Sequence, residues 1–298
     1  MAKAMLIVNP SSGKEKAAEY KIEAEEALKS IYEEIDMKET AKEGDAADFA
    51  RNACSSEYEA VIAMGGDGTI NEAVNGLAEQ TDRPKFGLIP MGTVNDFARA
   101  LKIPLKPSEA IEILKAQSIR PVDIGQINDR YFMNVLAVGA IAEASYNVTP
   151  EQKTKFGPFA YVMEGIKAFI KKTPFELSIK HESGTWEGSA YLMLASLTNS
   201  VGGFESFNPE ARVNDGKFHI FVLKDFSIPN LFTIIPGLLK GELKEHDSVE
   251  YIRSSFIEVS SSENLAVNID GDEGTPLPFD AQVLKSHLNI FVPRRKNE

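Results

Sequence analysis

The stretch Tyr58-Glu59-Ala60-Val61-Ile62-Ala63-Met64-Gly65-Gly66-Asp67-Gly68-Thr69-Ile70-Asn71-Glu72 decides the fold of the N-terminal half of the chain. Tyr58 to Met64 are mostly apolar and predict a buried strand, which Gly65 to Thr69 interrupt. Ile70 to Ala78 then predict a helix. Because glycines lack Cβ, backbone N–H groups can approach an anion closely, and a helix N-terminus favours negative charge. The stretch therefore predicts a phosphate site between a strand and a helix.

Asp67 is an unusual neighbour for a phosphate. The two anions repel each other unless a cation lies between them, so Asp67 indicates Mg²⁺ or a Mg²⁺-bound water. The alternative is a glycine-rich turn in which Thr69 only caps the helix. Two other phosphate loops are excluded. Ser12-Gly13-Lys14-Glu15 has Glu where a P-loop requires Ser or Thr, and Asn71 stands where a dinucleotide fingerprint requires glycine.

The alternation of strand and helix continues on both sides of this stretch. Strands are predicted at Ala4 to Val8, Ile35 to Lys38 and Phe86 to Ile89, and helices at about Lys14 to Tyr32 and Asp45 to Ala53. Such alternation implies a parallel sheet with right-handed crossovers, which binds ligands at the carboxyl ends of its strands. We expect three loops at that edge, namely Asn9-Pro10, Gly65-Gly66 and Pro90-Met91-Gly92.

The segment Pro90-Met91-Gly92-Thr93-Val94-Asn95-Asp96-Phe97-Ala98-Arg99 also follows a strand and precedes a predicted helix. Gly92 and Thr93 could therefore offer an N–H and a hydroxyl to the same ligand. Asn95 and Asp96 could contact it too, or could serve only as helix caps.

From about Ile119 the pattern changes to strand-like runs, most of them without helices between them. These features predict an antiparallel sandwich or barrel as a second domain, with helical segments near Phe159 to Ile170 and Ile228 to Leu239. We place the boundary near residue 125, giving domains 1–125 and 126–298, and the run His287 to Val292 could return to either. The strand-like runs are Val122 to Ile127, Tyr131 to Val138, Phe175 to His181, Gly188 to Leu197, Lys217 to Leu223, Tyr251 to Val259 and Leu265 to Ile269.

Two acidic turns lie in this second half. Asp270, Asp272 and Glu273 crowd three carboxylates into four residues, which suits a general base or a metal ligand but equally a solvated turn. Asn214-Asp215-Gly216 is first a hairpin turn signal, although Asp215 with neighbouring carbonyls could hold a hard cation.

Composition excludes several classes of protein. The chain has 298 residues, and 32 Lys and Arg against 44 Asp and Glu give a net charge of −12, so a nucleic-acid partner is not expected. Cys54 is the one cysteine, which excludes an internal disulfide and a multi-cysteine metal site. The apolar run that ends at Val8 is too short for a signal segment, and no run reaches the length of a membrane span. We expect a cytoplasmic protein.

Four motifs together resemble the bacterial soluble diacylglycerol kinases and their lipid-kinase relatives, which share a catalytic domain with eukaryotic diacylglycerol and sphingosine kinases. They occur in that family's order, and the likeness spans nearly the whole chain. The first motif is also similar to segments of NAD kinases and phosphofructokinases, whereas the second favours lipid kinases. The motifs are Gly65 to Glu72, Ile89 to Arg99, Val122-Asp123-Ile124-Gly125 and Asn268-Ile269-Asp270-Gly271.

The resemblance implies an α/β nucleotide domain like those of NAD kinase and phosphofructokinase, followed by a C-terminal antiparallel β-sandwich. It implies a structural Mg²⁺ on Asp215 and the carbonyls of Arg212 and Lys217, with Asp123 in the charge network of a catalytic Mg²⁺. With the loops considered above, the predicted ATP contacts are Asn9, Pro10, Ser11, Ser12, Gly13, Thr40, Gly65, Gly66, Asp67, Gly68, Thr69, Asn71, Glu72, Gly92 and Thr93.

The predicted catalytic residues are Asp272, Asp270 and Asp67. The family pattern is Asp-Gly-Glu with the glutamate as proton acceptor, whereas this chain reads Asp270-Gly271-Asp272-Glu273. The base is therefore Asp272, Asp270 or Glu273. The predicted reaction is ATP- and Mg²⁺-dependent phosphorylation of a lipid hydroxyl, diacylglycerol to phosphatidic acid. The alternatives are a NAD kinase-like enzyme, or a catalytically weak lipid- or nucleotide-binding regulator, because Asp272 replaces the glutamate.

A lipid substrate implies transient, peripheral contact with a membrane surface, and a homodimer is possible. Candidate contact surfaces are Phe156-Gly157-Pro158-Phe159 with Lys167, Lys171 and Lys172, and the apolar stretch Leu231 to Leu239. Each apolar stretch could instead be an ordinary core helix.

Overall fold

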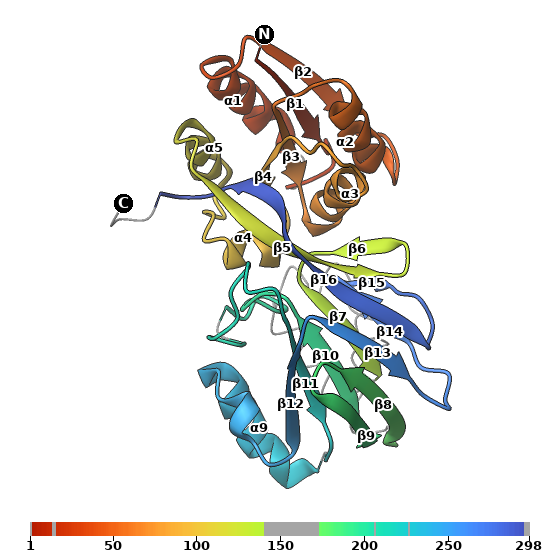
Figure 1. Cartoon of the computed structure of the whole chain (residues 1–298). Helices are drawn as coiled ribbons and strands as arrows, with labels where there is room; N and C mark the ends of the chain where they lie inside the picture. Colours follow the sequence, from red (N-terminus) through yellow and green to blue (C-terminus); the bar gives the residue numbers. More distant parts are fainter. Residues whose placement is uncertain (1, 14–15, 140–172, 206, 226, 295–298) are drawn as a thin grey trace. The chain divides into compact units, whose positions relative to one another are not determined.

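The computed structural model of the chain describes residues 2–13, 16–139, 173–205, 207–225 and 227–294 (Figure 1). It divides into two compact units. The first comprises Met1–Val122 and Ser286–Glu298, and the second comprises Asp123–Lys285. Two long strands, β5 (Ile119–Ile127) and β16 (Phe279–Phe291), each begin in one unit and end in the other.

The first unit contains a parallel sheet of four strands in the order β2-β1-β3-β4. The end of β16 extends this sheet, because Ile290 pairs in parallel with Phe86 of β4. These pairings confirm the predicted α/β fold class. The strands are β1 (Lys3–Val8), β2 (Glu34–Glu39), β3 (Ala60–Gly65) and β4 (Lys85–Pro90).

Helices pack on both faces of this sheet (Figure 1), which explains why β3 is apolar throughout and why β1 and β4 are apolar after their first residue, a lysine. α1 (Ala17–Lys29) and α5 (Pro107–Lys115) pack around Leu6 and Ile62. α2 (Asp45–Ser55) and α3 (Asp67–Ala78) contact each other so closely that a Cβ on Gly76 would lie 2.1 Å from the Ala47 carbonyl oxygen. A short helix, α4 (Asp96–Ala100), follows β4.

The second unit is a sandwich of antiparallel strands, as predicted. One sheet has the order β12-β11-β10-β7-β14-β15, and the other contains β16, β13, β8 and β9 in that order, with β5 and β6 pairing beside β16. Side chains from both sheets share one core, for example Met193 of β10 and Ile257 of β13. The strands are β6 (Arg130–Phe132), β7 (Val135–Gly139), β8 (Phe175–His181), β9 (Gly184–Ala190), β10 (Leu192–Ser196), β11 (Phe218–Leu223), β12 (Val249–Ser254), β13 (Phe256–Ser260), β14 (Val267–Ile269) and β15 (Asp272–Glu273).

Three predicted strands are wrong in one respect, because each is two strands. Tyr131 to Val138, Gly188 to Leu197 and Tyr251 to Val259 each break where the chain crosses from one sheet to the other. The apolar pattern continues through each crossing because both strands face the same core. Periodicity alone therefore does not mark these breaks.

Two predicted helices have different outcomes. The helix expected at Ile228 to Leu239 is α9 (Ile228–Lys240), followed by a 3₁₀ turn at Leu243–Glu245. Ile234 and Leu238 of α9 pack against a core cluster that contains Phe221, which supports a core role for that face. The helix expected at Phe159 to Ile170, and the surface residues proposed beside it, lie outside the described residues. Among the described helices, none is long and apolar enough to cross a membrane.

Candidate functional site

Three loops of the first unit interlock around the start of α3. In the loop after β1, Asn9 donates from Nδ2 to Thr69 Oγ1 at 2.9 Å. In the loop after β4, the backbone N–H of Asn95 donates to Asp67 Oδ2, also at 2.9 Å. The first and third loops also touch, because a Cβ on Gly13 would lie 2.4 Å from Met91 Cε. The structure thus places at one edge the three segments that the parallel-strand rule predicts there.

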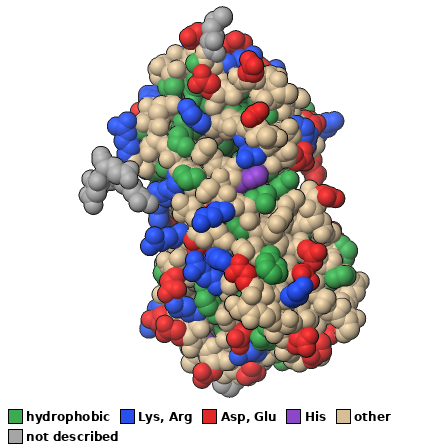
Figure 2. Space-filling model, viewed as in Figure 1, with side chains coloured by type: hydrophobic (Ala, Val, Ile, Leu, Met, Phe, Trp, Pro, Cys, Tyr) green, Lys and Arg blue, Asp and Glu red, His purple; other side chains and the backbone are tan. Residues whose placement is uncertain are grey.

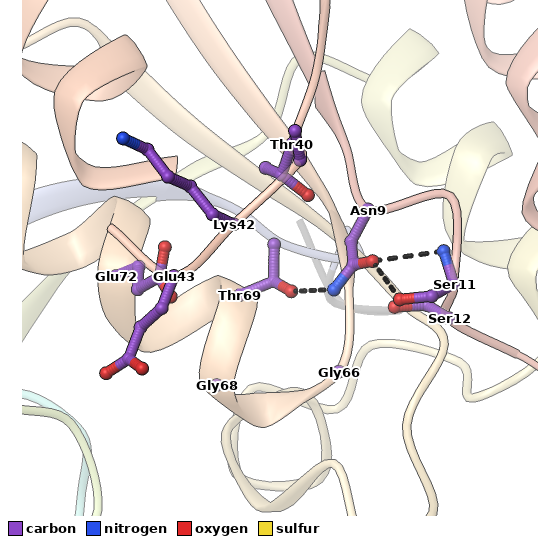
Figure 3. A pocket seen from close by; sticks show the side chains of 11 residues that line it. Asn9, Ser11, Ser12, Thr40, Lys42, Glu43, Gly66, Gly68, Thr69 and Glu72 are labelled. Carbon is purple, nitrogen blue, oxygen red and sulfur yellow. Dashed lines mark hydrogen bonds between the residues drawn. The ribbon is translucent and has the colours of Figure 1, made fainter. Parts of the chain in front are cut away.

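A pocket of about 440 Å³ opens beside these loops. Figure 3 shows Asn9 between Thr69 and the two serines, with Thr40 above Thr69 in this view, while Lys42 extends away from this group. Asn9 Oδ1 accepts hydrogen bonds from the Ser11 backbone N–H at 3.1 Å and from the Ser11 hydroxyl at 2.7 Å. The lining residues are Asn9, Ser11, Ser12, Thr40, Ala41, Lys42, Glu43, Gly66, Gly68, Thr69 and Glu72.

Eight of the residues predicted to contact ATP line this pocket, and the remaining seven do not. Ala41, Lys42 and Glu43 also line it but were not predicted. They follow β2, so the rule that ligands meet the carboxyl ends of parallel strands was the signal available for them. The predicted residues outside the lining are Pro10, Gly13, Gly65, Asp67, Asn71, Gly92 and Thr93.

The glycine-rich segment contains the beginning of α3. The helix starts at Asp67, three residues before the predicted start, and Gly66 is an extended N-cap with no side-chain cap. The suggestion that Thr69 caps the helix is therefore wrong. Thr69 lies inside the first turn, and Gly65 must lack a side chain because its Cβ would lie 2.5 Å from Thr69 Cβ. The backbone N–H groups of the first helical turn have no intrahelical partners, and they carry the positive end of the helix dipole.

In the second unit, the Asp270 carboxylate accepts three backbone hydrogen bonds. The N–H groups of Met133, Asn134 and Val135 donate to it at 2.6, 2.9 and 2.8 Å. Asp270 has a positive φ of 51°, and its own N–H donates to the Val135 carbonyl at 2.9 Å. Asp270 therefore fastens the turn after β14 to the chain segment that precedes and begins β7.

Asp272 and Glu273 form the two-residue strand β15, and both are exposed. Asp272 pairs with Ile269 and Glu273 with Asn268. Because adjacent strand residues point to opposite faces, these two carboxylates do not share a direction. The structure thus separates the three candidate bases into one fastened carboxylate and two exposed ones.

Asp215 lies in a partly buried polar network. Its Oδ2 accepts from His219 Nε2 at 2.9 Å and lies 3.3 Å from Arg253 Nη2, and its Oδ1 accepts from the Lys217 N–H at 3.0 Å. Burial favours the neutral acid, but the hydrogen bonds and charge of His219, with Lys217 and Arg253, outweigh it and lower the pKa of Asp215. The other ring nitrogen of His219 lies 2.6 Å from the Tyr251 hydroxyl.

Asp123 is tied to the same turn. Its buried carboxylate accepts from the Gly216 N–H at 2.6 Å, and its own N–H donates to the Val213 carbonyl at 2.7 Å. The predicted metal residues Arg212, Asp215, Lys217 and Asp123 therefore lie on one turn and the strand beside it. Within the described ranges, no cluster of three or more His, Cys, Asp or Glu side chains could hold a metal ion. A cation at this turn would therefore depend on backbone carbonyls as well.

Comparison with protein families covers both units. Residues 3–127 match the diacylglycerol kinase catalytic domain, and residues 134–292 match the YegS C-terminal NAD kinase beta sandwich-like domain. A diacylglycerol kinase from Staphylococcus epidermidis is 39% identical over 292 residues, which are 98% of this chain and 92% of that protein. One from Bacillus subtilis is 36% identical over 304 residues, covering 100% and 99%.

The fold comparison agrees. A crystal structure of a diacylglycerol kinase from Bacillus anthracis superimposes with a TM-score of 0.85 at 28% identity, covering 97% of this chain and 96% of that one. Similarity in sequence and in structure thus extends over nearly the whole chain and over both units. The chain belongs to the diacylglycerol kinase family of lipid kinases.

Proposed function

We propose that the protein transfers the γ-phosphate of ATP, with Mg²⁺, to the hydroxyl of diacylglycerol and so forms phosphatidic acid. The observation that carries this proposal is the interlocked edge of the first unit, where Asn9 bonds Thr69 beside the uncapped start of α3 and a pocket lined by hydroxyls. Hydroxyls and a helix N-terminus bind phosphate oxygens well. Membership of a lipid kinase family supports the choice of acceptor.

In this proposal the phosphates of ATP meet the pocket side chains and the first turn of α3. Ser11, Ser12, Thr40 and Thr69 supply hydroxyls, and the N–H groups of Gly68 and its neighbours supply backbone donors. Phosphoryl transfer depends mainly on alignment and on neutralisation of charge, which donors of this kind provide.

The available donors suit Mg²⁺, because carboxylates and carbonyl oxygens are the ligands that hard cations prefer. Asp67 would hold a cation between its carboxylate and the phosphates. Asp215, with the Arg212 and Lys217 carbonyls, would hold a structural ion that Asp123 supports from beside the turn. The cation held by Asp67 would neutralise the charge that develops on the transferred phosphate.

We assign the proton acceptor to Asp272 and a positioning role to Asp270. Three N–H donors stabilise the anionic form of Asp270, which makes this carboxylate a weak acceptor. Asp272 is exposed and occupies the place of the family's glutamate. As the lipid oxygen bonds to the γ-phosphorus, the bond to ADP breaks and the hydroxyl proton passes to Asp272.

The proposal is tested by transfer of labelled γ-phosphate from ATP with Mg²⁺ to diacylglycerol micelles, ceramide, sphingosine, phosphatidylglycerol and NAD. Labelled phosphatidic acid from the wild-type protein, lost in Asp272→Asn, is the expected result. Label on NAD alone would make the protein a NAD kinase. Binding of ATP without any product would indicate a regulator.

We also propose that the protein acts in the cytoplasm and contacts the membrane only transiently, because its substrate lies there. The wild-type protein should sediment with vesicles that contain diacylglycerol and anionic lipid, and should be released at high salt. Failure to bind such vesicles under turnover conditions would contradict this proposal.

A further inference from the structure

Asn95 connects two parts of the site that are far apart in sequence. Its side chain binds both backbone polar groups of Gly92: Oδ1 accepts from the Gly92 N–H at 2.9 Å, and Nδ2 donates to the Gly92 carbonyl at 2.8 Å. Its backbone N–H donates to Asp67 Oδ2 at 2.9 Å. One residue therefore holds the loop after β4 and the carboxylate at the start of α3.

The packing around Asn95 leaves little freedom. Asn95 is 7% exposed and adopts a left-handed backbone with φ 53° and ψ 48°, which asparagine tolerates better than most residues. A Cβ on Gly92 would lie 2.7 Å from Asn95 Oδ1 and 3.0 Å from Gly66 Cα. The Gly92 loop is thus pressed between Asn95 and the N-cap of α3. The position of the Gly92 loop therefore determines where the backbone N–H of Asn95 meets the Asp67 carboxylate.

We propose that Asn95 is a positioning residue for phosphoryl transfer and acts through Asp67. This inference rests on the proposed function, in which Asp67 holds a cation against the phosphates. A carboxylate displaced by an ångström would hold that cation in the wrong place, although the pocket itself would remain. Asn95 does not line the pocket. The effect of substituting Asn95 should therefore depend on the Mg²⁺ that Asp67 holds.

The test is a double-mutant cycle between Asn95→Gly and Asp67→Asn. Glycine keeps the left-handed backbone and the N–H but removes both side-chain hydrogen bonds. We expect Asn95→Gly to lower kcat about tenfold to a hundredfold. In the Asp67→Asn background the same change should lower kcat by less than about threefold, because residues that act through one another are not additive.

A second measurement does not depend on turnover. By calorimetry, Asn95→Gly should weaken binding of Mg·ADP about fivefold and leave binding of metal-free ADP unchanged, and the Mg·ADP effect should vanish in the Asp67→Asn background. Asn128→Gly is the matched control, because Asn128 also has a positive φ, of 48°, but lies in an exposed turn of the second unit. It should change neither value.

Equal losses in both backgrounds, or equal losses with and without Mg²⁺, would overturn the proposal. If Asn95→Gly fails to fold, Asn95→Asp takes its place and is compared in the same two backgrounds. It keeps an acceptor for the Gly92 N–H, replaces the donor to the Gly92 carbonyl with an oxygen and adds a negative charge. If the wild-type protein binds Mg·ADP but phosphorylates no lipid, the proposed function fails and the binding cycle still decides the role of Asn95. A wild-type protein that binds no ADP overturns both.

Discussion

Backbone N–H groups gather at two places in this molecule, with opposite results. At the start of α3, in the first unit, no side chain caps the helix and a pocket opens beside it. At Met133 to Val135, in the second unit, Asp270 of the same chain already occupies three such groups. The same chemistry attracts an anion in both places. Donors beside an open pocket suit a ligand, whereas donors bound by a side chain of the protein stabilise the fold.

The largest effect is expected for kcat when Asp272 is substituted. It distinguishes this exposed carboxylate from the fastened carboxylate of Asp270. Asp272→Asn should lower kcat about a hundredfold to ten-thousandfold, the usual contribution of a general base, without lowering thermal stability, because Asp272 is exposed. A phosphate-transfer assay measures the predicted loss of kcat, and thermal melting measures the predicted unchanged stability. Asp272→Glu, which restores the family's residue, should recover most of the activity. Near-normal kcat in Asp272→Asn would transfer the role to Glu273.

Asp270→Ala should instead affect mainly stability. It leaves three N–H groups without their acceptor, and a loss of about 3 to 5 kcal/mol in the free energy of unfolding follows if each charged hydrogen bond is worth about 1.5 kcal/mol. Urea denaturation measures this loss. Asp270→Asn retains one acceptor oxygen and should lose less. If Asp270→Ala kept full stability but lost turnover, Asp270 would be a catalytic residue. The three N–H donors at Met133 to Val135 would then not stabilise the fold through Asp270.

Gly68→Ala examines the donors at the start of α3. A Cβ on Gly68 would meet no atom within 4 Å, and alanine favours a helix, so the free energy of unfolding should rise by up to about 1 kcal/mol. The same methyl group would lie in the pocket and should weaken ATP binding about tenfold, which is about 1.4 kcal/mol. Calorimetry and melting on one sample measure both. If Gly68→Ala left the affinity for ATP unchanged, the phosphates of ATP would not bind beside Gly68.

The smallest effect concerns Glu182, an exposed carboxylate that also has several donors. Hydrogen bonds from Lys217 and Ser255 lower its pKa from 4.5 to about 2. Because the folded state holds the proton less tightly, the stabilisation is present above pH 4.5 and is lost as the pH falls toward about 2. Solvent screening keeps it below about 1 kcal/mol. The stability difference between the wild-type protein and Glu182→Gln should therefore shrink as the pH falls from about 4.5 to about 2. A constant difference would contradict the lowered pKa.

Sequence patterns predicted which loops meet beside the pocket better than they predicted the arrangement of the acidic turns. The glycine-rich segment, the Asn9 loop and the Gly92 loop all follow predicted strands, and parallel topology places such loops together. Nothing in the pattern of Asp270, Asp272 and Glu273 distinguished a fastened carboxylate from exposed ones. That distinction depends on Met133 to Val135, which are more than 130 residues away in the chain. Long-range backbone donors have no local signature.

Figure 2 shows acidic, basic and hydrophobic side chains mixed over the face in view. The sequence by itself determined the order of strands and helices, the α/β and antiparallel halves and the glycine-rich segment between β3 and α3, because periodicity and glycine placement are local properties. Only the tertiary structure decided that Asn95 holds Asp67, that Asp270 is fastened, and that three apolar runs cross between sheets. Each of these depends on hydrogen bonds or packing between segments far apart in the chain, which no local pattern encodes.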